Sequence, residues 1–171
     1  IEGMDRSVGH LMKAVNAMGL DNNTLVIFTS DNGPFAADVR PLRAEKGHLY
    51  EGGIRVPLIV RWPGVTTPQT ICNTPVITMD LFQTIYAAAK LPPQPVKTDG
   101  MNIEPLLKGT GNWTREALFF HYPNYAFHKK NRLGSAIRVG NYKLVHFYDD
   151  GKSELYNLSE DIGETNNLAT I

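Results

Sequence analysis

The sequence contains a single cysteine, Cys72, among its 171 residues. One cysteine excludes a disulfide within the chain and any zinc site built from several thiolates. The sequence also lacks an excess of either charge, because 17 Lys and Arg residues balance 17 Asp and Glu residues. We therefore expect no nucleic-acid partner, since binding to nucleic acid requires a basic surface. No apolar run approaches the roughly 20 residues that cross a bilayer, so we expect no membrane span.

The chain begins at Ile1 rather than at an initiator Met, and its first recognisable pattern is already that of a helix. We expect it to be the later part of a longer protein. Any targeting signal would then lie in the missing part, so these residues leave the cellular location undetermined.

Hydrophobic spacing in the first 110 residues switches between the helical and the extended pattern. Apolar residues at steps of three and four predict helices over residues 4–18 and 78–90. Continuous apolar runs over residues 24–29 and 56–62 predict strands covered on both faces, as in a parallel sheet. The succession of helix, strand, strand and helix indicates an α/β fold.

Short runs bounded by turn signals characterise the rest of the chain: "ALFFHYP", "SAIRV", "YKLVHFY" and "ELYNL". The dipeptide Gly140-Asn141 is typical of a two-residue hairpin turn. We predict a small antiparallel sheet here, and a domain boundary near residue 110 that divides the chain into 1–110 and 111–171.

The stretch "TLVIFTSDNGP" places Asp31 and Asn32 at the end of a predicted strand. Ligand sites of open α/β sheets gather at such ends, and carboxylate and amide oxygens suit calcium or magnesium. The alternative is an Asn-Gly hairpin turn. The following residues do not alternate, and Pro34 cannot donate to a strand ladder, which weakens the hairpin interpretation without excluding it.

Further along, "LRAEKGHLYEGGIRVPLIVRWPG" contains Lys46 beside a glycine, where backbone and ammonium can both approach an anion. A lysine in a loop is also commonly just solvated. Glu51 and Arg55, four residues apart, are most simply an ordinary ion pair.

Together, "NNTLVIFTSDNGP" and "LRAEKGHLYEGGIRVPLIVRWPG" resemble the second half of a type I sulfatase, a member of the arylsulfatase family in the alkaline-phosphatase-like superfamily. The resemblance extends upstream to "GMDRSVGHLMKAVNAMGLDNN" and downstream to "ELYNLSEDIGETNNLA", so it covers nearly the whole chain. It implies part of a mixed sheet with flanking helices in 1–110, the C-terminal part of the sulfatase catalytic domain. Residues 111–171 would form a small C-terminal antiparallel-sheet subdomain.

The resemblance also implies roles for individual residues. Asp31 and Asn32 would ligate the active-site calcium, with magnesium as an alternative, and Lys46 would bind a sulfate oxygen and act in catalysis. His48 and His121 are candidates for substrate contact, although a strand-end histidine such as His121 is equally explained by partial burial among aromatic neighbours. Glu51 with its partner would shape the wall of the site.

The substrate implied by the family is a sulfate ester, either an aryl sulfate or a sulfated carbohydrate. Tyr122, Tyr125 and Phe127 form an aromatic cluster that is suited to stacking on a sugar ring, or equally to the core of the subdomain. Two rival functions stay open: a phosphonate monoester hydrolase or phosphodiesterase of the same superfamily, and a non-catalytic binding domain.

The family nucleophile is a formylglycine made from the Cys or Ser of a "C/S-x-P-x-R" signature. Cys72 lies in "ICNTPV", with no arginine in register, and does not match it. We therefore expect the formylglycine in a missing N-terminal half, which would be this chain's partner, and we expect the 171-residue chain alone to be inactive. The family favours export, to the periplasm or the extracellular space, or a lysosomal location.

Overall fold

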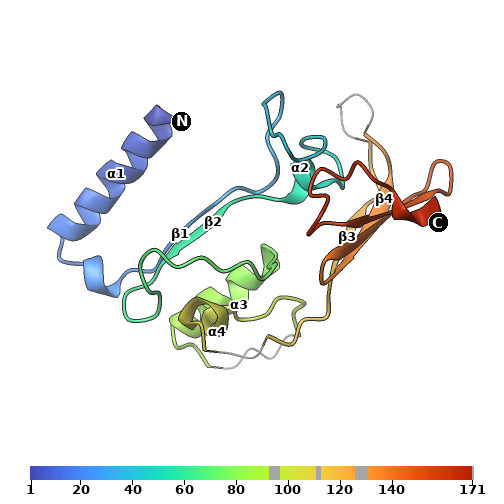
Figure 1. Cartoon of the computed structure of the whole chain (residues 1–171). Helices are drawn as coiled ribbons and strands as arrows, with labels where there is room; N and C mark the ends of the chain where they lie inside the picture. The colour runs from blue at the N-terminus through green and yellow to red at the C-terminus, as the bar shows by residue number, and fades with distance from the viewer. Residues whose placement is uncertain (93–96, 111–112, 126–130, 171) are drawn as a thin grey trace. The chain divides into compact units, whose positions relative to one another are not determined.

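The computed structural model describes residues 1–92, 97–110, 113–125 and 131–170 (Figure 1). The chain divides into two compact units. The first unit comprises Ile1–Phe28 and Leu58–Trp113, and the second unit comprises Thr29–Pro57 and Thr114–Ile171. The predicted site loop thus groups with the C-terminal sheet. The predicted division into domains near residue 110 stays a prediction.

The first unit contains the helices and strands that the hydrophobic spacing predicts. They are α1 (Glu2–Ala17), β1 (Val26–Thr29), β2 (Leu58–Arg61) and α3 (Met79–Ala88), with β1 hydrogen-bonded to β2. A short helix, α4 (Glu104–Lys108), and a 3₁₀ turn, η1 (Asp21–Asn23), were not predicted. The fold is mixed α/β, as predicted.

Asp80, in the first turn of α3, is fully buried and organises one end of the first unit. Its carboxylate accepts hydrogen bonds from the backbone N–H of Ile77 (2.9 Å) and of Met101 (2.8 Å). The Thr84 hydroxyl, one turn later, accepts from the Ile103 N–H (3.0 Å). These bonds fix the segment before α4 against α3, because buried backbone donors must find acceptors.

The second unit consists of the short helix α2 (Glu51–Ile54), a four-stranded antiparallel sheet and a terminal 3₁₀ turn, η2 (Leu168–Thr170). The strands are β3 (Ala117–Tyr122), β4 (Gly134–Val139), β5 (Tyr142–Phe147) and β6 (Ser153–Asn157), in that spatial order. Gly140, at φ +56°, allows the tight turn between β4 and β5. The predicted antiparallel sheet and its Gly140-Asn141 hairpin are confirmed.

The two faces of this sheet differ sharply. Leu118, Arg138, Lys143 and Tyr156 lie opposite one another in register, and this face carries the core. The buried apolar residues of that core are Leu49, Tyr50, Ala136, Val145, Phe147, Tyr156 and Leu158. On the other face, the cross-strand row of His121, Ser135, His146 and Ser153 stands beside the exposed Phe119. The core face is therefore the one that receives α2.

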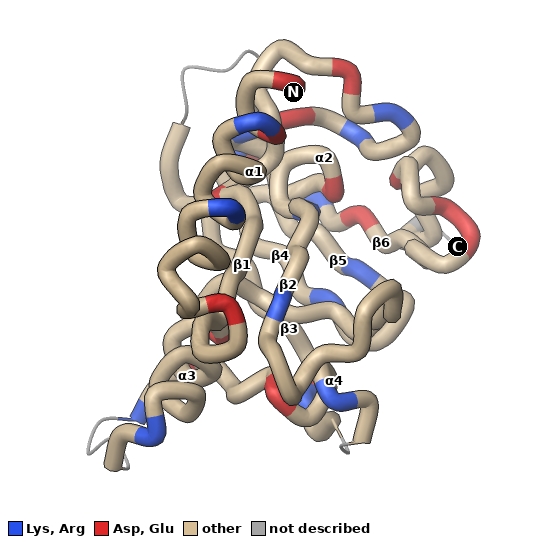
Figure 2. The backbone as a smooth tube through the Cα atoms, turned by 90° about the vertical axis from the view of Figure 1, so that its left-hand side faces the viewer, with Lys and Arg blue, Asp and Glu red and all other residues tan. Residues whose placement is uncertain are grey.

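Both charge signs occur along the backbone in Figure 2, as the equal counts of 17 and 17 require. No described helix combines the length and the apolarity needed to cross a membrane. In the described parts of the chain, α1 buries none of its residues, and β1 and β2 are at most half-buried. We expected both faces of these strands to be buried, but the described residues do not bury them.

Candidate functional site

The chain leaves β1 at Thr29 and turns through Asp31 and Asn32. The Thr29 hydroxyl donates to the Pro57 carbonyl (2.9 Å), and the Ser30 hydroxyl donates to the Asn32 carbonyl (2.9 Å). No strand lies between residues 30 and 57, all of which are described, and β1 pairs with β2 instead. The hairpin interpretation of this turn is therefore wrong.

Gly33 is buried where the turn meets α2. Its N–H donates to the Gly53 carbonyl (2.8 Å), and a Cβ at this position would overlap the Gly52 carbonyl oxygen. Gly52 and Gly53 are equally confined, since a Cβ on either would overlap a carbonyl oxygen of the preceding loop. Only glycine permits such close approach of one backbone to another.

The loop that carries Lys46 joins the same contact. The Lys46 N–H donates to the Pro34 carbonyl (2.9 Å), and the Gly52 N–H donates to the Arg43 carbonyl (2.8 Å). The Asn131 amide donates to the Gly47 carbonyl (2.6 Å) from the beginning of the sheet. The structure therefore brings together the Asp31 turn (residues 30–34) and the Lys46 loop (residues 43–48), both against α2.

The donor chemistry of the Asp31 turn fits a hard cation. Asp31 is exposed and Asn32 is half-buried, and their oxygens are of the kind that calcium and magnesium prefer. Among the described residues, no group of three or more His, Cys, Asp or Glu side chains gathers into a metal site. The described chain thus offers two suitable ligands, fewer than the six to eight that calcium takes.

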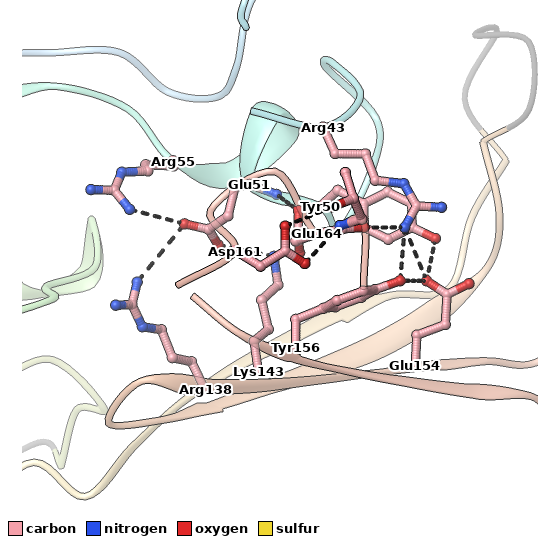
Figure 3. Close-up of polar contacts among 11 residues, drawn as sticks. Arg43, Tyr50, Glu51, Arg55, Arg138, Lys143, Glu154, Tyr156, Asp161 and Glu164 are labelled. Atoms are coloured by element: carbon pink, nitrogen blue, oxygen red, sulfur yellow. Dashed lines mark hydrogen bonds and ion pairs between the residues drawn. The ribbon is translucent and has the colours of Figure 1, made fainter. Parts of the chain in front are cut away.

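Glu51, the first residue of α2, contacts several charged side chains (Figure 3). It pairs with Arg55 across 3.4 Å, as the spacing predicts, yet its carboxylate also lies 3.0 Å from the Lys143 ammonium and 3.9 Å from Arg138. Its backbone N–H donates to Glu164 Oε2 (2.7 Å). The prediction of an ordinary ion pair between Glu51 and Arg55 is therefore incomplete, because Glu51 also contacts Lys143, Arg138 and Glu164.

Lys143 and Glu164 are both fully buried in the second unit. The Lys143 ammonium lies 2.8 Å from Glu164 Oε1, an ionic contact whose angle gives that oxygen no hydrogen bond. Burial raises the pKa of Glu164, although Lys143 acts in the opposite direction. The cluster formed by Glu51, Lys143 and Glu164 is called the buried triad below.

A second polar group extends the triad toward β6. The Arg43 guanidinium lies 3.9 Å from the centre of the Tyr50 ring and donates to the Tyr156 hydroxyl (2.8 Å) and to the Glu164 carbonyl (2.8 Å). Glu154 accepts from both tyrosine hydroxyls, each at 2.6 Å. Burial and the hydrogen bond to Glu154 raise the pKa of both tyrosines, so both stay neutral.

The two candidate histidines have different surroundings. His48 is half-buried, with Nδ1 3.0 Å from the Glu45 carbonyl oxygen in the Lys46 loop. His121 lies on the sheet face opposite α2, where its Nδ1 is 2.9 Å from the Ser135 hydroxyl. The structure therefore places His48 within the site loops and does not bring His121 to them. Substrate contact by either histidine stays a prediction.

The aromatic cluster is only partly described. Tyr122 packs against the core of the second unit, Tyr125 is 63% exposed, and Phe127 lies outside the described residues. Cys72, which does not match a nucleophile signature, is an exposed free thiol.

Sequence reasoning missed Lys143 and Glu164. In "YKLVHFY" the lysine shares its strand face with Val145 and Phe147, but lysine is a residue type that normally stays exposed. A weak signal was available, because Val145 and Phe147, two and four positions after Lys143, place the lysine on the apolar face of its strand. Its acidic partner Glu51 is 92 positions away, beyond the reach of local patterns.

Solved structures resemble this chain over nearly its full length. The structure of BT4656 in complex with its substrate D-glucosamine-2-N,6-O-disulfate has a TM-score of 0.81 and 27% identity, covering 96% of this chain and 33% of that one. Ps i-CgsB in complex with k-i-k-neocarrahexaose also has a TM-score of 0.81, with 30% identity and coverage of 97% and 37%. The fold is that of sulfatases of the alkaline-phosphatase-like class.

The sequence comparisons identify the family. The family profile described as N-sulphoglucosamine sulphohydrolase, C-terminal, matches residues 44–170. A sulfatase of Formosa agariphila is 40% identical over 98% of this chain and 34% of its own length. Human arylsulfatase A is 37% identical over 96% of this chain and 37% of its own length. The chain belongs to the sulfatase family through this C-terminal region, and it spans about a third of the length of these relatives.

Proposed function

We propose that this chain supplies half of the active site of a sulfuric ester hydrolase. The single observation that carries the proposal is the packing of the Asp31 turn and the Lys46 loop on α2, in a chain of the sulfatase family. This packing holds a carboxylate, an amide and an ammonium on neighbouring loops. Such a set of groups suits an anionic ester bound through a cation.

Asp31 and Asn32 are the calcium ligands in this proposal, with magnesium as the alternative cation. A divalent cation would polarise a sulfate oxygen and neutralise charge on it. The role of the two residues is to present hard oxygens from a rigid strand end, and Gly33 fixes the turn that presents them. The remaining ligands would come from the N-terminal half of the longer protein.

Lys46 binds a sulfate oxygen and stabilises the charge that develops as the ester bond breaks. Its backbone N–H donates to the Pro34 carbonyl, which holds the Lys46 loop beside the Asp31 turn. The nucleophile, a formylglycine made from Cys or Ser, lies outside this chain, because Cys72 has no arginine in the register of the signature. The chain alone is therefore inactive.

The substrate class is a sulfate monoester, and a sulfated carbohydrate is favoured over a simple aryl sulfate. Support comes from the structural relative that holds a glucosamine disulfate as its substrate and from the family profile of a sulphoglucosamine sulphohydrolase. His48 is the candidate in this chain for contact with the sugar. Export to the periplasm or extracellular space, or a lysosomal location, is consistent with this substrate.

A phosphonate monoester hydrolase is the second candidate. The phosphonate monoester hydrolase SpPMH from Silicibacter pomeroyi has a TM-score of 0.71 at 22% identity, a likeness of fold alone. Because the metal and lysine would serve a phosphonate as well as a sulfate, the two functions differ in substrate and not in the groups described here. A non-catalytic binding domain would turn over neither ester.

The test compares turnover of para-nitrophenyl sulfate and of a para-nitrophenyl phosphonate monoester by the full-length protein. We expect faster hydrolysis of the sulfate, and a loss of about 10²–10³ in its rate in Lys46→Ala, since one charge-stabilising group is removed. Lys13→Ala, at an exposed position of α1, is the matched control and should keep the parent rate. Preference for the phosphonate would establish the second candidate, and turnover of neither para-nitrophenyl ester nor of a sulfated glucosamine would establish the third.

A further inference from the structure

The buried triad lies directly behind the two loops that carry the proposed ligands. Glu51 is the first residue of α2, and the next two residues are the glycines on which the Asp31 turn and the Lys46 loop rest. The contacts that hold Glu51 in place therefore also hold Gly52 and Gly53, against which both loops pack. The contacts of Glu51 come from β4, from β5 and from the C-terminal tail, far away in sequence.

The path from Lys143 to the loops consists of one ionic contact and two backbone hydrogen bonds, joined through α2. The Lys143 ammonium lies 3.0 Å from Glu51 Oε1. One residue further, the Gly52 N–H bonds the Arg43 carbonyl (2.8 Å), at the start of the Lys46 loop. Two residues further, the Gly53 carbonyl receives the Gly33 N–H (2.8 Å) of the Asp31 turn. No link in this path passes through a flexible exposed side chain.

Charge explains why a lysine occupies this place. Glu51 and Glu164 are 3% and 0% exposed, so two carboxylates lie in an interior that strongly disfavours uncompensated charge. Lys143, also 0% exposed, is the ammonium that contacts both of them. Removing one partner of a buried ion pair leaves the others uncompensated, which displaces them or the elements that carry them. We expect α2 to move in that case, because this helix has only four residues.

We propose that Lys143 is a positioning residue for the proposed sulfate ester site, acting through Glu51 and α2 on the Asp31 turn and the Lys46 loop. This inference rests on the proposed function. Lys143 touches neither loop and is not assigned any contact with substrate or metal. Its effect is to hold Asp31, Asn32 and Lys46 at one mutual geometry.

The test uses the full-length protein with Lys143→Met, Glu51→Gln and the double variant. The first readout is the affinity for calcium, measured by titration from a chelator. We expect each single variant to weaken it by about 10- to 100-fold, the range for residues that orient a metal ligand from behind. Both variants break the same contact, so their effects should not add. The double variant should bind calcium as tightly as the single variant with the lower affinity. Lys152→Met, at an exposed lysine with 77% side-chain exposure, is the matched control and should bind calcium as the parent does.

The second readout is amide hydrogen exchange, which needs neither calcium nor turnover. The N–H groups of Gly33, Lys46 and Gly52 should exchange at least about tenfold faster in the variants, because their bonds depend on α2. The N–H groups of α3 and of the β3–β4 ladder should keep their protection. Glu51→Gln retains the volume of the side chain, so it carries the test even where Lys143→Met fails to fold.

Three results would overturn the inference. One is a folded variant with parent-like calcium affinity and unchanged exchange at Gly33, Lys46 and Gly52. Another is faster exchange throughout the chain, which would mean that the triad stabilises the whole protein equally. The third is failure of every triad variant to fold. If the parent itself binds no calcium, the proposed function fails, and the exchange pattern still decides the positioning role.

Discussion

Asp31 and Asn32 illustrate how a single residue's role depends on what its neighbours do. The dipeptide at the end of a strand is compatible with a hairpin turn, and only the pairing of β1 with β2 removes that alternative. The burial of Gly33 against α2 then leaves Asp31 exposed at a fixed place. The metal-ligand role that we propose follows from this position and from the donor chemistry.

Asp31→Ala in the full-length protein should abolish calcium binding at the site and most of the sulfate ester turnover. The change removes an anionic ligand, so the loss should exceed the roughly 10- to 100-fold effect of residues that only orient a ligand. The melting temperature should change little, since the side chain is exposed. The measurement is a calcium titration paired with initial rates on para-nitrophenyl sulfate.

Asp38→Ala provides the control in the same loop. Asp38 is exposed and pairs with Arg40, and such surface pairs contribute little to stability. Its calcium affinity and rate should match the parent. An Asp31→Ala protein that keeps the parent's calcium affinity and rate would remove Asp31 from the site.

Glu164 gives a prediction about pH. Burial raises its folded-state pKa above the ordinary 4.5, even though the Lys143 ammonium and the Glu51 N–H favour the charged form and the Glu51 carboxylate opposes it. A raised carboxyl pKa means that the folded state holds the proton more tightly than the unfolded state. The resulting stabilisation is complete below pH 4.5 and is lost as the pH rises toward the folded-state pKa.

Glu164→Gln mimics the protonated carboxyl and should not lose this stability. The quantity to follow is the melting temperature of the variant minus that of the parent. We expect this difference to increase as the pH rises above about 4.5 and then to level off. Glu160→Gln, at an exposed glutamate, should show no such trend. A difference that is constant with pH, or that shrinks as pH rises, would contradict the assigned direction.

Residue-level reasoning from sequence singled out the site residues that we propose, but not the buried residues behind them. Asp31 and Asn32 follow a predicted strand and Lys46 precedes a glycine, so local pattern and family resemblance both predict ligands there. Lys143 is different, because whether a strand lysine is buried depends on a carboxylate 92 residues away. Periodicity describes only a residue's own element, so it carries no information on such a pair.

At the scale of elements, the strands of the second unit were predictable because each is short, alternating and bounded by a turn. Gly140-Asn141 sets the β4–β5 hairpin, and the register then follows from the alternation. α4, with five residues, is too short to show a helical period, and its signals are confined to its ends, Pro105 in the first turn and the left-handed Gly109 after the last. The contact between the Asp31 turn and α2 depends on three glycines that lie close to backbone carbonyl oxygens. Local sequence patterns do not predict such contacts.

Gly33→Ala tests this contact between elements. An added Cβ would overlap the Gly52 carbonyl oxygen, so the turn must move away from α2 and lose the bond between Gly33 and Gly53. We expect the protein to be destabilised by more than about 1 kcal/mol, with weaker calcium binding. Chemical denaturation of the full-length protein measures the first effect and calcium titration the second.

Gly9→Ala, in the middle of α1, is the matched control. A Cβ there meets nothing within 4 Å, and the change should stabilise the helix by about 0.5–1 kcal/mol. If Gly33→Ala were tolerated as well as Gly9→Ala, the packing of the turn on α2 would not control the site.

At the scale of the whole molecule, the chain exposes many apolar side chains. Large exposed examples in the first unit are Met4, Leu11, Met18, Ile59, Phe82 and Ile85. Contiguous exposed apolar surface favours association. The chain also spans only about a third of the length of its relatives, 34% and 37% for the two described above. We therefore expect the apolar side chains of the first unit to drive association.

Expressed alone, the 171-residue chain should be poorly soluble or self-associated, and should hydrolyse no sulfate ester. The physical reason is that the apolar side chains of α1, β2 and α3 lack a cover among the described residues. Size-exclusion chromatography with light scattering measures the first expectation. A monomeric chain that melts sharply would contradict it.

The most direct test of the central claim, that this chain supplies half of a sulfatase active site, is complementation. The preceding segment of the longer protein would be co-expressed with this chain, and turnover of para-nitrophenyl sulfate would be measured for each part and for the pair. We predict turnover only for the pair, and its loss when the chain carries Asp31→Ala or Lys46→Ala. Turnover by the 171-residue chain alone, or undiminished turnover by the pair with either substitution, would contradict the account.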